Sequence, residues 1–287
     1  VVYHVDAPSI TRYTGNYDNF VSVYETKKKQ LEAAYNRQQA EIEKMEDFIA
    51  RNKARVATRG MANSRMKQLN KMERIELKKE KIKPEFAFQY SSTPSKYLFI
   101  ANDIEIGYDY PLSKPMTFTL EKNKKVAIVG ANGIGKTTLL KSLLGIIDVL
   151  SGSIEHGENI DVGYFVQEEK ASSQTCIQEL WDTFPAYSQY EVRSALAKCG
   201  LTTEQIESQV FVLSGGEQAK LRLCKIMNHP CNLLVLDEPT NHLDQDAKDS
   251  LKEAIQAFKG TVLLVSHEPY FYEDIVDEVW DMSQYSI

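Results

Sequence analysis

The chain has 287 residues, of which 43% are hydrophobic, and its formal net charge is −6 at pH 7. This composition is ordinary for a globular protein with an apolar core. It excludes a membrane-spanning segment, because no apolar run approaches the roughly 20 residues that a membrane helix needs. No secretory signal is present, and the four cysteines are scattered without metal-ligand spacing. We expect a part of a longer cytoplasmic protein, since Val1 is not a natural start.

The charge is unevenly distributed along the chain. Residues 20–83 carry 17 Lys and Arg against 9 Asp and Glu, whereas residues 84–287 carry 16 against 29. A basic segment is therefore joined to an acidic body. Such an asymmetry indicates a polyanionic partner for the basic segment.

Two long helices are predicted between residues 19 and 83. This segment contains no proline, and Gly60 is its one glycine. Apolar residues recur at helical spacing, interrupted once by Gln38, at Leu31, Tyr35, Ile42, Met45 and Ile49, and then at Met66, Leu69, Met72, Ile75 and Ile82. The pattern predicts a helical hairpin that turns near Gly60 and whose second helix continues to Pro84. Residues 84–95 follow as a connector.

The turn of this hairpin is strongly basic. Between residues 51 and 67 the chain has no acid and six basic residues: Arg51, Lys53, Arg55, Arg59, Arg65 and Lys67. A solvated helix face would explain most charge runs, but such faces usually mix both signs, as residues 41–44 do here. The sequence therefore favours binding to the phosphate backbone of a nucleic acid.

The rest of the chain, residues 96–287, has the pattern of an α/β domain. Two segments alternate as half-buried strands do, at 104–106 and 116–120. Three continuous apolar runs suit a parallel sheet covered on both faces, at 125–129, 233–236 and 261–265. Helices are predicted around 138–144, 191–199 and 216–227, with a small all-helical insert between 170 and 212.

A glycine-rich turn follows the strand that ends at Val129. It fits the eight-position phosphate-binding pattern without a mismatch, through Gly130, Asn132, Gly133, Gly135, Lys136 and Thr137. A helix is expected to begin at Lys136, so that the backbone N–H groups from Asn132 to Thr138 point at the phosphates of ATP. Lys136 supplies a point charge to these phosphates, and the Thr137 hydroxyl is a ligand for Mg²⁺.

Two adjacent acids end the apolar run at 233–236. The strand delivers the carboxylate of Asp237 to the same sheet edge, where we expect it to hold Mg²⁺. Glu238 is expected to orient or deprotonate the attacking water. Two such acids at the end of a buried strand are difficult to justify by structure alone.

Three further positions belong to the predicted site. His267 follows the strand at 261–265, on the ligand-binding edge of a parallel sheet, and is expected to contact the γ-phosphate. Gln167 is predicted to contact Mg²⁺ and the water. Tyr108 is the candidate for stacking on the adenine ring, but Tyr110 competes with it.

These motifs, together with Leu-Ser-Gly-Gly-Glu-Gln at 213–218, resemble the ATP-binding cassette superfamily. The resemblance implies that Ser214, Gly215, Gly216 and Glu217 contact a nucleotide held by a different cassette, with the positive end of the following helix aimed at its γ-phosphate. The active site would then be composite. It would need a second cassette of the parent chain or, in its absence, a homodimer.

In detail the chain resembles the ABC-F branch, in which Asn-His-Leu-Asp, here 241–244, follows Asp-Glu-Pro-Thr. By this resemblance residues 1–18 end a preceding cassette, 19–83 form the interdomain linker, 84–95 connect, and 96–287 form the second cassette. Members act on the ribosome near the tRNA exit site, with the linker reaching towards P-site tRNA. The partners implied are thus the ribosome, rRNA and tRNA, with no membrane. The fold implied is an α/β P-loop NTPase core with small antiparallel β and helical subdomains, preceded by an antiparallel coiled-coil hairpin.

Other ATPases share this chemistry. A transporter cassette would have a helical insert shaped for a membrane domain and no basic coiled coil in front. In chromosome-maintenance and double-strand-break ATPases the coil separates the phosphate loop from the signature, whereas here it precedes both. An ATP-gated RNA-binding module, in which turnover serves only release, stays open. So does antibiotic resistance by ribosome protection, although the short basic tip favours a general translation factor.

Overall fold

The computed structural model describes residues 1–6, 9–53, 58–75, 83–167 and 170–287. They form two compact units, Val1–Glu80 and Lys81–Ile287. The first unit contains the predicted hairpin, and the second contains the phosphate loop and the other nucleotide motifs. Arg55 and Ile82 of the predicted hairpin lie outside the described residues.

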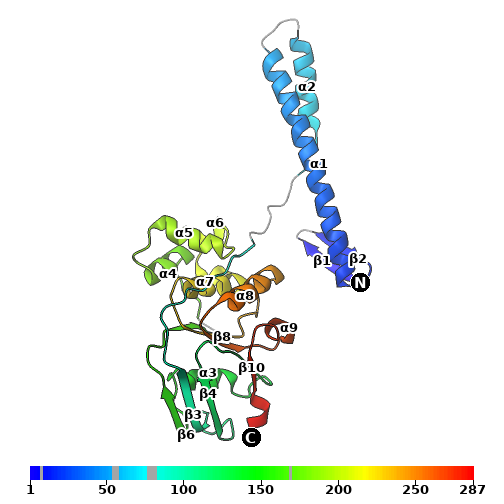
Figure 1. Ribbon diagram of the computed structural model, residues 1–287. Coiled ribbons are helices and arrows are strands. Elements are labelled where there is room, and N and C mark those ends of the chain that lie inside the picture. Colours follow the sequence, from blue (N-terminus) through cyan, green and yellow to red (C-terminus); the bar gives the residue numbers. More distant parts are fainter. Residues whose placement is uncertain (7–8, 54–57, 76–82, 168–169) are drawn as a thin grey trace. The chain divides into compact units, whose positions relative to one another are not determined.

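The first unit is a helical hairpin that follows a small sheet (Figure 1). Strand β1 (Val2–Asp6) pairs antiparallel with β2 (Ser9–Tyr13). The Asn16 side chain caps helix α1 (Tyr17–Asn52) by accepting a hydrogen bond from the Asn19 backbone N–H at 3.0 Å. Helix α2 (Arg59–Lys71) packs back on α1. The buried apolar residues of the pair are Ile42, Ala62 and Leu69. The predicted antiparallel hairpin is confirmed.

The second helix ends earlier than the sequence predicts. It stops at Lys71, and Met72 has extended backbone with φ −72° and ψ 122°. The Gln38 side chain of α1 faces this extended segment, donating to the Glu73 carbonyl at 2.8 Å and accepting from the Ile75 N–H at 2.7 Å. Gln38 thus satisfies backbone groups that a continued helix would have paired by itself. This explains the one polar residue in the apolar stripe of α1.

A central sheet of five parallel strands organises the second unit. The spatial order is β10-β5-β9-β8-β7. In that order the strands are Glu278–Asp281, Lys125–Val129, Thr261–Val265, Leu233–Asp237 and Val162–Phe165. A separate antiparallel sheet has the order β4-β3-β6, with the strands Met116–Glu121, Tyr97–Glu105 and Ser151–His156. The predicted parallel sheet and the smaller antiparallel sheet are both confirmed.

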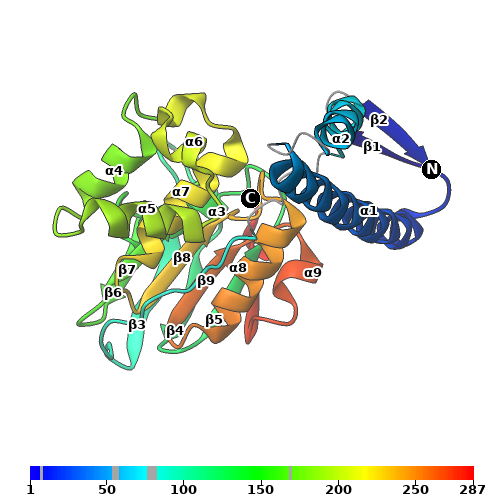
Figure 2. The same ribbon diagram turned by 90° about the horizontal axis from the view of Figure 1, so that it is seen from above.

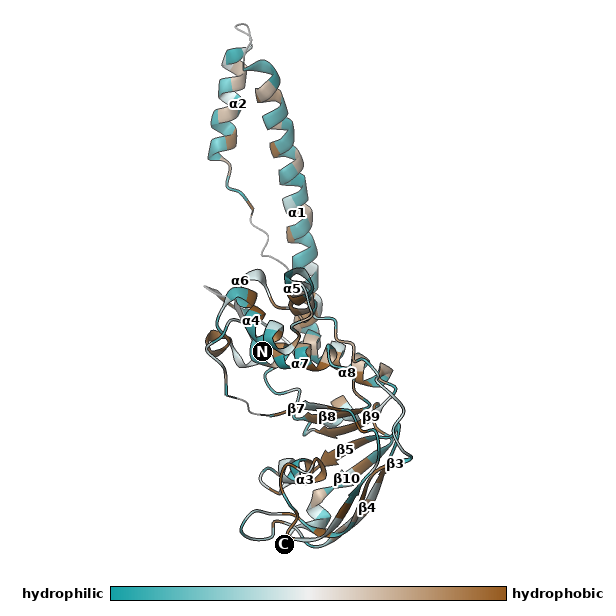
Figure 3. Cartoon of the chain, turned by 90° about the vertical axis from the view of Figure 1, so that its left-hand side faces the viewer, coloured by the Kyte–Doolittle hydropathy of each residue, from teal (hydrophilic) through white to brown (hydrophobic). Residues whose placement is uncertain are grey.

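The parallel sheet divides the core into two layers (Figures 1 and 3). On one face Leu234 and Leu236 pack with α7 (Gly215–Met227) and α8 (Gln245–Ala257). On the other face Leu233 and Val235 pack with α3 (Lys136–Leu143) and the antiparallel sheet. Because successive side chains of a strand point to opposite faces, one apolar run serves both layers.

A helical insert follows β7. It comprises α4 (Cys176–Thr183), α5 (Gln189–Lys198), α6 (Thr203–Glu207) and the 3₁₀ turn η1 (Val210–Val212). The three α-helices each begin with a capping box, at Thr175/Gln178, Ser188/Glu191 and Thr202/Gln205. In each box the N-cap hydroxyl accepts from the backbone N–H three residues later, and the side chain of that later residue accepts from the N-cap backbone N–H. Figure 2 shows these helices on one side of α7 and α8 on the other. The short helix α9 (Pro269–Tyr272) and the turn η2 (Met282–Tyr285) complete the unit.

The connector after the hairpin is bound along the second unit. The Glu85 N–H donates to the Lys198 carbonyl at 2.7 Å, which joins the connector to the end of α5. The Phe86 N–H donates to the hydroxyl of Ser250 on α8 at 3.1 Å. These hydrogen bonds explain why a segment with linker composition has a defined path. Within the described ranges, no helix is both long and apolar enough for a membrane span.

Candidate functional site

The phosphate loop joins β5 to α3 through three glycines with positive φ. Gly130, Gly133 and Gly135 have φ of 143°, 79° and 104°, values that other residues adopt only with strain. Gly135 is the N-cap of α3, so the helix begins at Lys136 as predicted. The turn aims the unpaired N–H groups of the first helical turn, including that of Thr138, at the space in front of the loop. Asn132 is exposed in the turn.

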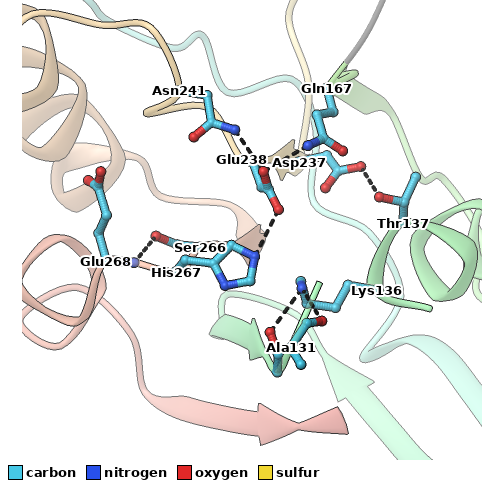
Figure 4. Close-up of polar contacts among 11 residues, drawn as sticks. Ala131, Lys136, Thr137, Gln167, Asp237, Glu238, Asn241, Ser266, His267 and Glu268 are labelled. Carbon is cyan, nitrogen blue, oxygen red and sulfur yellow. Dashed lines mark hydrogen bonds and ion pairs between the residues drawn. The ribbon is translucent and has the colours of Figure 1, made fainter. Parts of the chain in front are cut away.

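Lys136 is 5% exposed, and its ammonium group lies across its own loop. It donates to the carbonyls of Gly130 at 3.0 Å and Ala131 at 2.9 Å (Figure 4). Burial lowers the pKa of Lys136, and the charges of Glu238 and Asp237 oppose that shift. A phosphate would restore a counter-charge that two carbonyl dipoles only partly replace.

Asp237 ends β8 and is fully buried. Its Oδ2 accepts a hydrogen bond from the Thr137 hydroxyl at 2.7 Å, so two of the three predicted metal ligands lie together. Burial, aided by the charge of Glu238, outweighs that hydrogen bond and raises the pKa of Asp237. Its other oxygen, Oδ1, has no hydrogen-bond partner among the described residues. A buried carboxylate oxygen beside a hydroxyl fits Mg²⁺, which prefers oxygen ligands.

Glu238 is held by three side chains from three different loops (Figure 4). Its Oε2 accepts from Gln167 Nε2 at 2.8 Å and from Asn241 Nδ2 at 2.7 Å, and its Oε1 lies 2.9 Å from His267 Nε2. Its backbone has φ 51°, an unusual value for a residue with a side chain. The structure therefore brings the predicted Glu238, His267 and Gln167 together, and a strained backbone at this point is typical of a functional position.

Sequence reasoning missed Asn241 as a contact of Glu238. In the sequence it is the first residue of Asn-His-Leu-Asp, the four-residue motif that follows Asp-Glu-Pro-Thr. Its backbone N–H donates to the Glu238 carbonyl at 3.2 Å, closing a turn that returns the amide to the carboxylate. An asparagine three residues after a strand-ending acid is a usual turn residue, and that signal could have found it.

The loop that carries the two candidate tyrosines lies beside the phosphate loop. A Cβ on Gly135 would meet Ile106 at 3.1 Å and Leu112 at 3.7 Å, so the loop packs against the start of α3. Tyr108 is 57% exposed and Tyr110 is 68% exposed. Both rings are available to stack on a base, and the choice between them stays a prediction.

The signature residues form the start of α7. Ser214 is the N-cap, and the Glu217 side chain accepts from the Ser214 N–H at 2.8 Å and from Gln205 Nε2 at 2.6 Å. Both carboxylate oxygens of Glu217 are thus engaged within the chain, and its part in nucleotide binding stays a prediction. Gly215 and Gly216 lie against His242, whose atoms a Cβ would meet at 3.1 and 2.5 Å. The backbone oxygen of His242 leaves no room for a Cβ at Gly216, whereas a Cβ at Gly215 would be a tight contact with the His242 ring.

The signature and the phosphate loop belong to different layers. Helix α7 packs in the layer with Leu234 and Leu236, whereas α3 packs in the layer with Leu233 and Val235. The parallel sheet therefore lies between the two helices (Figure 3). The structure does not bring the signature residues to the contacts that join the phosphate loop to Glu238.

Arg222 joins α7 to the loop of Gln167. Its guanidinium donates to the carbonyls of Val166 at 2.8 Å and Gln167 at 3.0 Å and stacks on the Phe165 ring at 4.8 Å. An arginine in the middle of a helix has no sequence signature for such a role, and the sequence did not single it out. The contact connects the signature helix, through Gln167, with Glu238.

Comparisons with known proteins show what the chain is similar to. Two family models, both described as "ABC transporter", match residues 3–88 and 113–241. "Uncharacterized ABC transporter ATP-binding protein YfmM" of Bacillus subtilis is 58% identical over 100% of this chain and 55% of that protein. "ABC transporter F family member 5" of Arabidopsis thaliana is 33% identical over 93% of this chain and 40% of that protein. The chain thus spans about half the length of the curated relatives it matches.

A solved structure supports the fold. "Putative ABC transporter (ATP-binding protein) from Pyrococcus furiosus" superposes with a TM-score of 0.54 at 25% identity, covering 66% of this chain and 99% of that chain. The share of this chain that is covered is close to the size of the second unit. The likeness therefore covers nearly the whole of that ATP-binding protein.

Proposed function

The chain belongs to the ABC-type ATP-binding cassette family, and we propose that it is the linker and second cassette of an ABC-F protein that uses ATP to act on the ribosome. ABC-type cassettes in general bind and hydrolyse ATP. The observation that carries the finer proposal is the basic helical hairpin in front of the cassette. Relatives at modest identity include two members of the ABC transporter F family of Arabidopsis thaliana.

The proposed reaction gives a role to each side chain of the site. Lys136 and the backbone of the phosphate loop bind the β- and γ-phosphates, and Thr137 and Asp237 hold Mg²⁺, which neutralises phosphate charge when it is bound. Glu238 accepts a hydrogen bond or proton from the attacking water. Gln167 and His267 lie against its carboxylate, at 2.8 and 2.9 Å. We keep their predicted contacts as part of the proposal, Gln167 with Mg²⁺ and the water and His267 with the γ-phosphate.

We propose that a complete site needs two cassettes. The signature begins a helix in the layer opposite α3, so it cannot close over the nucleotide of its own phosphate loop. Ser214, Gly215 and Gly216 would serve a nucleotide bound elsewhere, in a second cassette of the same parent protein or in a second copy. The positive end of the 13-residue helix α7 favours an anion there.

The hairpin is proposed to bind RNA through only some of its cations. Arg51 pairs with Asp47 at 2.8 Å, and Arg65 stacks on the Phe48 ring at 3.8 Å, so both also serve the hairpin itself. Three other cations of the basic turn have no hydrogen-bond or ion-pair partner within the described part of the hairpin, namely Lys53, Arg59 and Lys67. Phosphates of rRNA or tRNA are their proposed partners.

The domain limits follow from the same proposal. Residues 1–18 end a preceding cassette, 19–83 form the linker, 84–95 connect, and 96–287 form the second cassette. A cassette of a transporter would need no basic hairpin, which makes that alternative weaker. Ribosome protection against antibiotics uses the same architecture, so it is a second outcome of the functional test.

Binding to ribosomes tests the proposal. The full-length protein should sediment with ribosomes when a non-hydrolysable ATP analogue is present, and tRNA that fills the exit site should displace it. Lys136→Ala, which removes a phosphate contact, should abolish the ATP dependence and serves as the matched control. Sedimentation that ignores both nucleotide and tRNA would contradict ribosome action, whereas altered antibiotic susceptibility of a deletion strain would favour ribosome protection.

A further inference from the structure

Glu268 directly follows His267 but turns away from the nucleotide site. Its backbone N–H donates to the hydroxyl of the buried Ser266 at 3.1 Å (Figure 4). Figure 4 shows its carboxylate on the opposite side of the loop from the His267 ring. The side chain therefore has partners of its own that the ATP chemistry does not use.

These partners come from α8 and α9. Lys248 Nζ donates to Glu268 Oε1 at 2.6 Å, and the Tyr270 hydroxyl donates to Oε2 at 2.7 Å. Lys248 also lies 3.3 Å from the Tyr270 hydroxyl, which closes a triangle. The side chains of Lys248 and Glu268 are only 16% and 28% exposed, so the pair is better shielded than a surface ion pair.

The charge of Glu268 is stabilised by these two side chains. Partial burial would raise the pKa of Glu268, but the hydrogen bonds from Lys248 and Tyr270 and the Lys248 charge hold it below its usual range. Glu268 is thus a carboxylate that accepts hydrogen bonds from two different helices.

The loop after β9 is consequently held at two adjacent residues. One link is Glu238 to His267 at 2.9 Å, inside the site. The other is Glu268 to Lys248 at 2.6 Å, outside the site, and it ties the loop after β9 to α8, the helix that follows the Glu238 loop. We infer that Glu268 is a positioning residue, which holds His267 and the Glu238 loop in register for ATP hydrolysis. The inference rests on the proposed hydrolytic roles of Glu238 and His267.

Removing the carboxylate should affect turnover more than binding. In the full-length protein, Glu268→Ala leaves the shielded Lys248 without its anion and frees the second link, while the phosphate loop keeps all its contacts. We expect kcat to fall about 10-fold to 100-fold with the KM for ATP unchanged, the cost typical of losing a support of reacting groups. Glu268→Gln keeps one carbonyl acceptor and should retain more activity than Glu268→Ala.

A matched control lies one helical turn along α8. Lys252 pairs with Asp274 at 3.0 Å, an acid of the same region that is 77% exposed and is not adjacent to His267 in the chain. Asp274→Ala should leave kcat within about twofold, as for an exposed surface substitution. A general loss of packing between α8 and α9 would instead lower kcat in both variants.

Amide hydrogen exchange gives a readout that does not depend on hydrolysis. Exchange should accelerate at 239–243 and 266–268 in Glu268→Ala, with no change in α3. Wild-type kcat together with unchanged exchange in Glu268→Ala would overturn the inference. If the proposed hydrolytic role of Glu238 were wrong, Glu238→Gln would keep wild-type ATP turnover. The amide exchange of Glu268→Ala would still decide whether Glu268 positions the two loops.

Discussion

Strands β8 and β9 of the cassette are buried along their whole length, whereas the described part of the hairpin buries only Ile42, Ala62 and Leu69 among its apolar residues. Figure 3 shows the same contrast, with brown strands in the cassette and a largely teal α1. Glu238 is fixed by contacts from three loops, while Lys53, Arg59 and Lys67 have no side-chain partner among the described residues of the hairpin. The cassette can therefore keep the side chains around Glu238 in fixed positions. The hairpin, with fewer buried contacts, can expose its basic side chains to a binding partner.

The largest expected effect is on ATP turnover, when one carboxylate oxygen of Glu238 in the cassette is replaced by an amide nitrogen. Glu238→Gln keeps the shape of the side chain and removes its capacity to take a proton. ATP turnover should fall by about 10²-fold to 10⁴-fold with ATP binding retained, as for a lost general base. Steady-state hydrolysis and nucleotide titration would measure this. Near-normal turnover would remove Glu238 from its proposed role and leave the cassette a binding module.

Because the signature and the phosphate loop lie on opposite faces of the parallel sheet, we expect one cassette alone to be a poor ATPase. A monomeric sample of this chain should hydrolyse ATP about 10²-fold more slowly than the two-cassette protein, the typical cost of missing transition-state donors. Activity should rise with the square of concentration if two copies complete each other. Light scattering would measure the molar mass and so show whether the sample is monomeric or dimeric. Full turnover in a demonstrably monomeric sample would show that the cassette completes its own site.

The difference in burial predicts different costs of core truncation. Leu264 of β9 is 0% exposed and Ile42 of α1 is 6% exposed. Leu264→Ala should cost about 4–5 kcal/mol and Ile42→Ala about 2 kcal/mol, the two ends of the range for buried aliphatic residues. Site-resolved amide exchange would report each unit separately. Equal costs would mean that the hairpin core is as tightly packed as the cassette core.

A smaller effect separates the two tyrosines beside the phosphate loop. Stacking of a base on an aromatic ring contributes about 1–3 kcal/mol. Tyr108→Ala should weaken ATP binding by that amount, with Tyr110→Ala as the matched control. Isothermal titration with ATP and with triphosphate alone would show whether the loss concerns the base. A loss confined to Tyr110→Ala would transfer the role to that residue.

The sequence predicted the parts of the structure that local patterns determine. The apolar runs gave β5, β8 and β9, and the glycine spacing gave the phosphate loop. The end of α2 could not be predicted, because it depends on the Gln38 side chain of another helix. Arg222 and Glu268 were missed for the same reason, since their partners are distant in sequence and have no common motif.

We propose that the two regions have separate functions. The cassette binds and hydrolyses ATP, and the tip of the hairpin contacts RNA. A triple variant, Lys53→Ala with Arg59→Ala and Lys67→Ala, removes the three cations that have no side-chain partner in the part of the hairpin that the structure describes. Lys114→Ala with Lys198→Ala and Lys259→Ala removes the same charge from the cassette and serves as the control.

The decisive measurement is the salt dependence of ribosome affinity for both variants. The tip variant should lower the log–log slope by about 2 to 3, at 0.7–0.9 per phosphate contact, and keep wild-type ATP affinity. The control variant should keep the wild-type slope. If the tip variant bound ribosomes with unchanged affinity and slope, the tip would be a solvated turn, and the assignment of RNA contact to the hairpin would be contradicted.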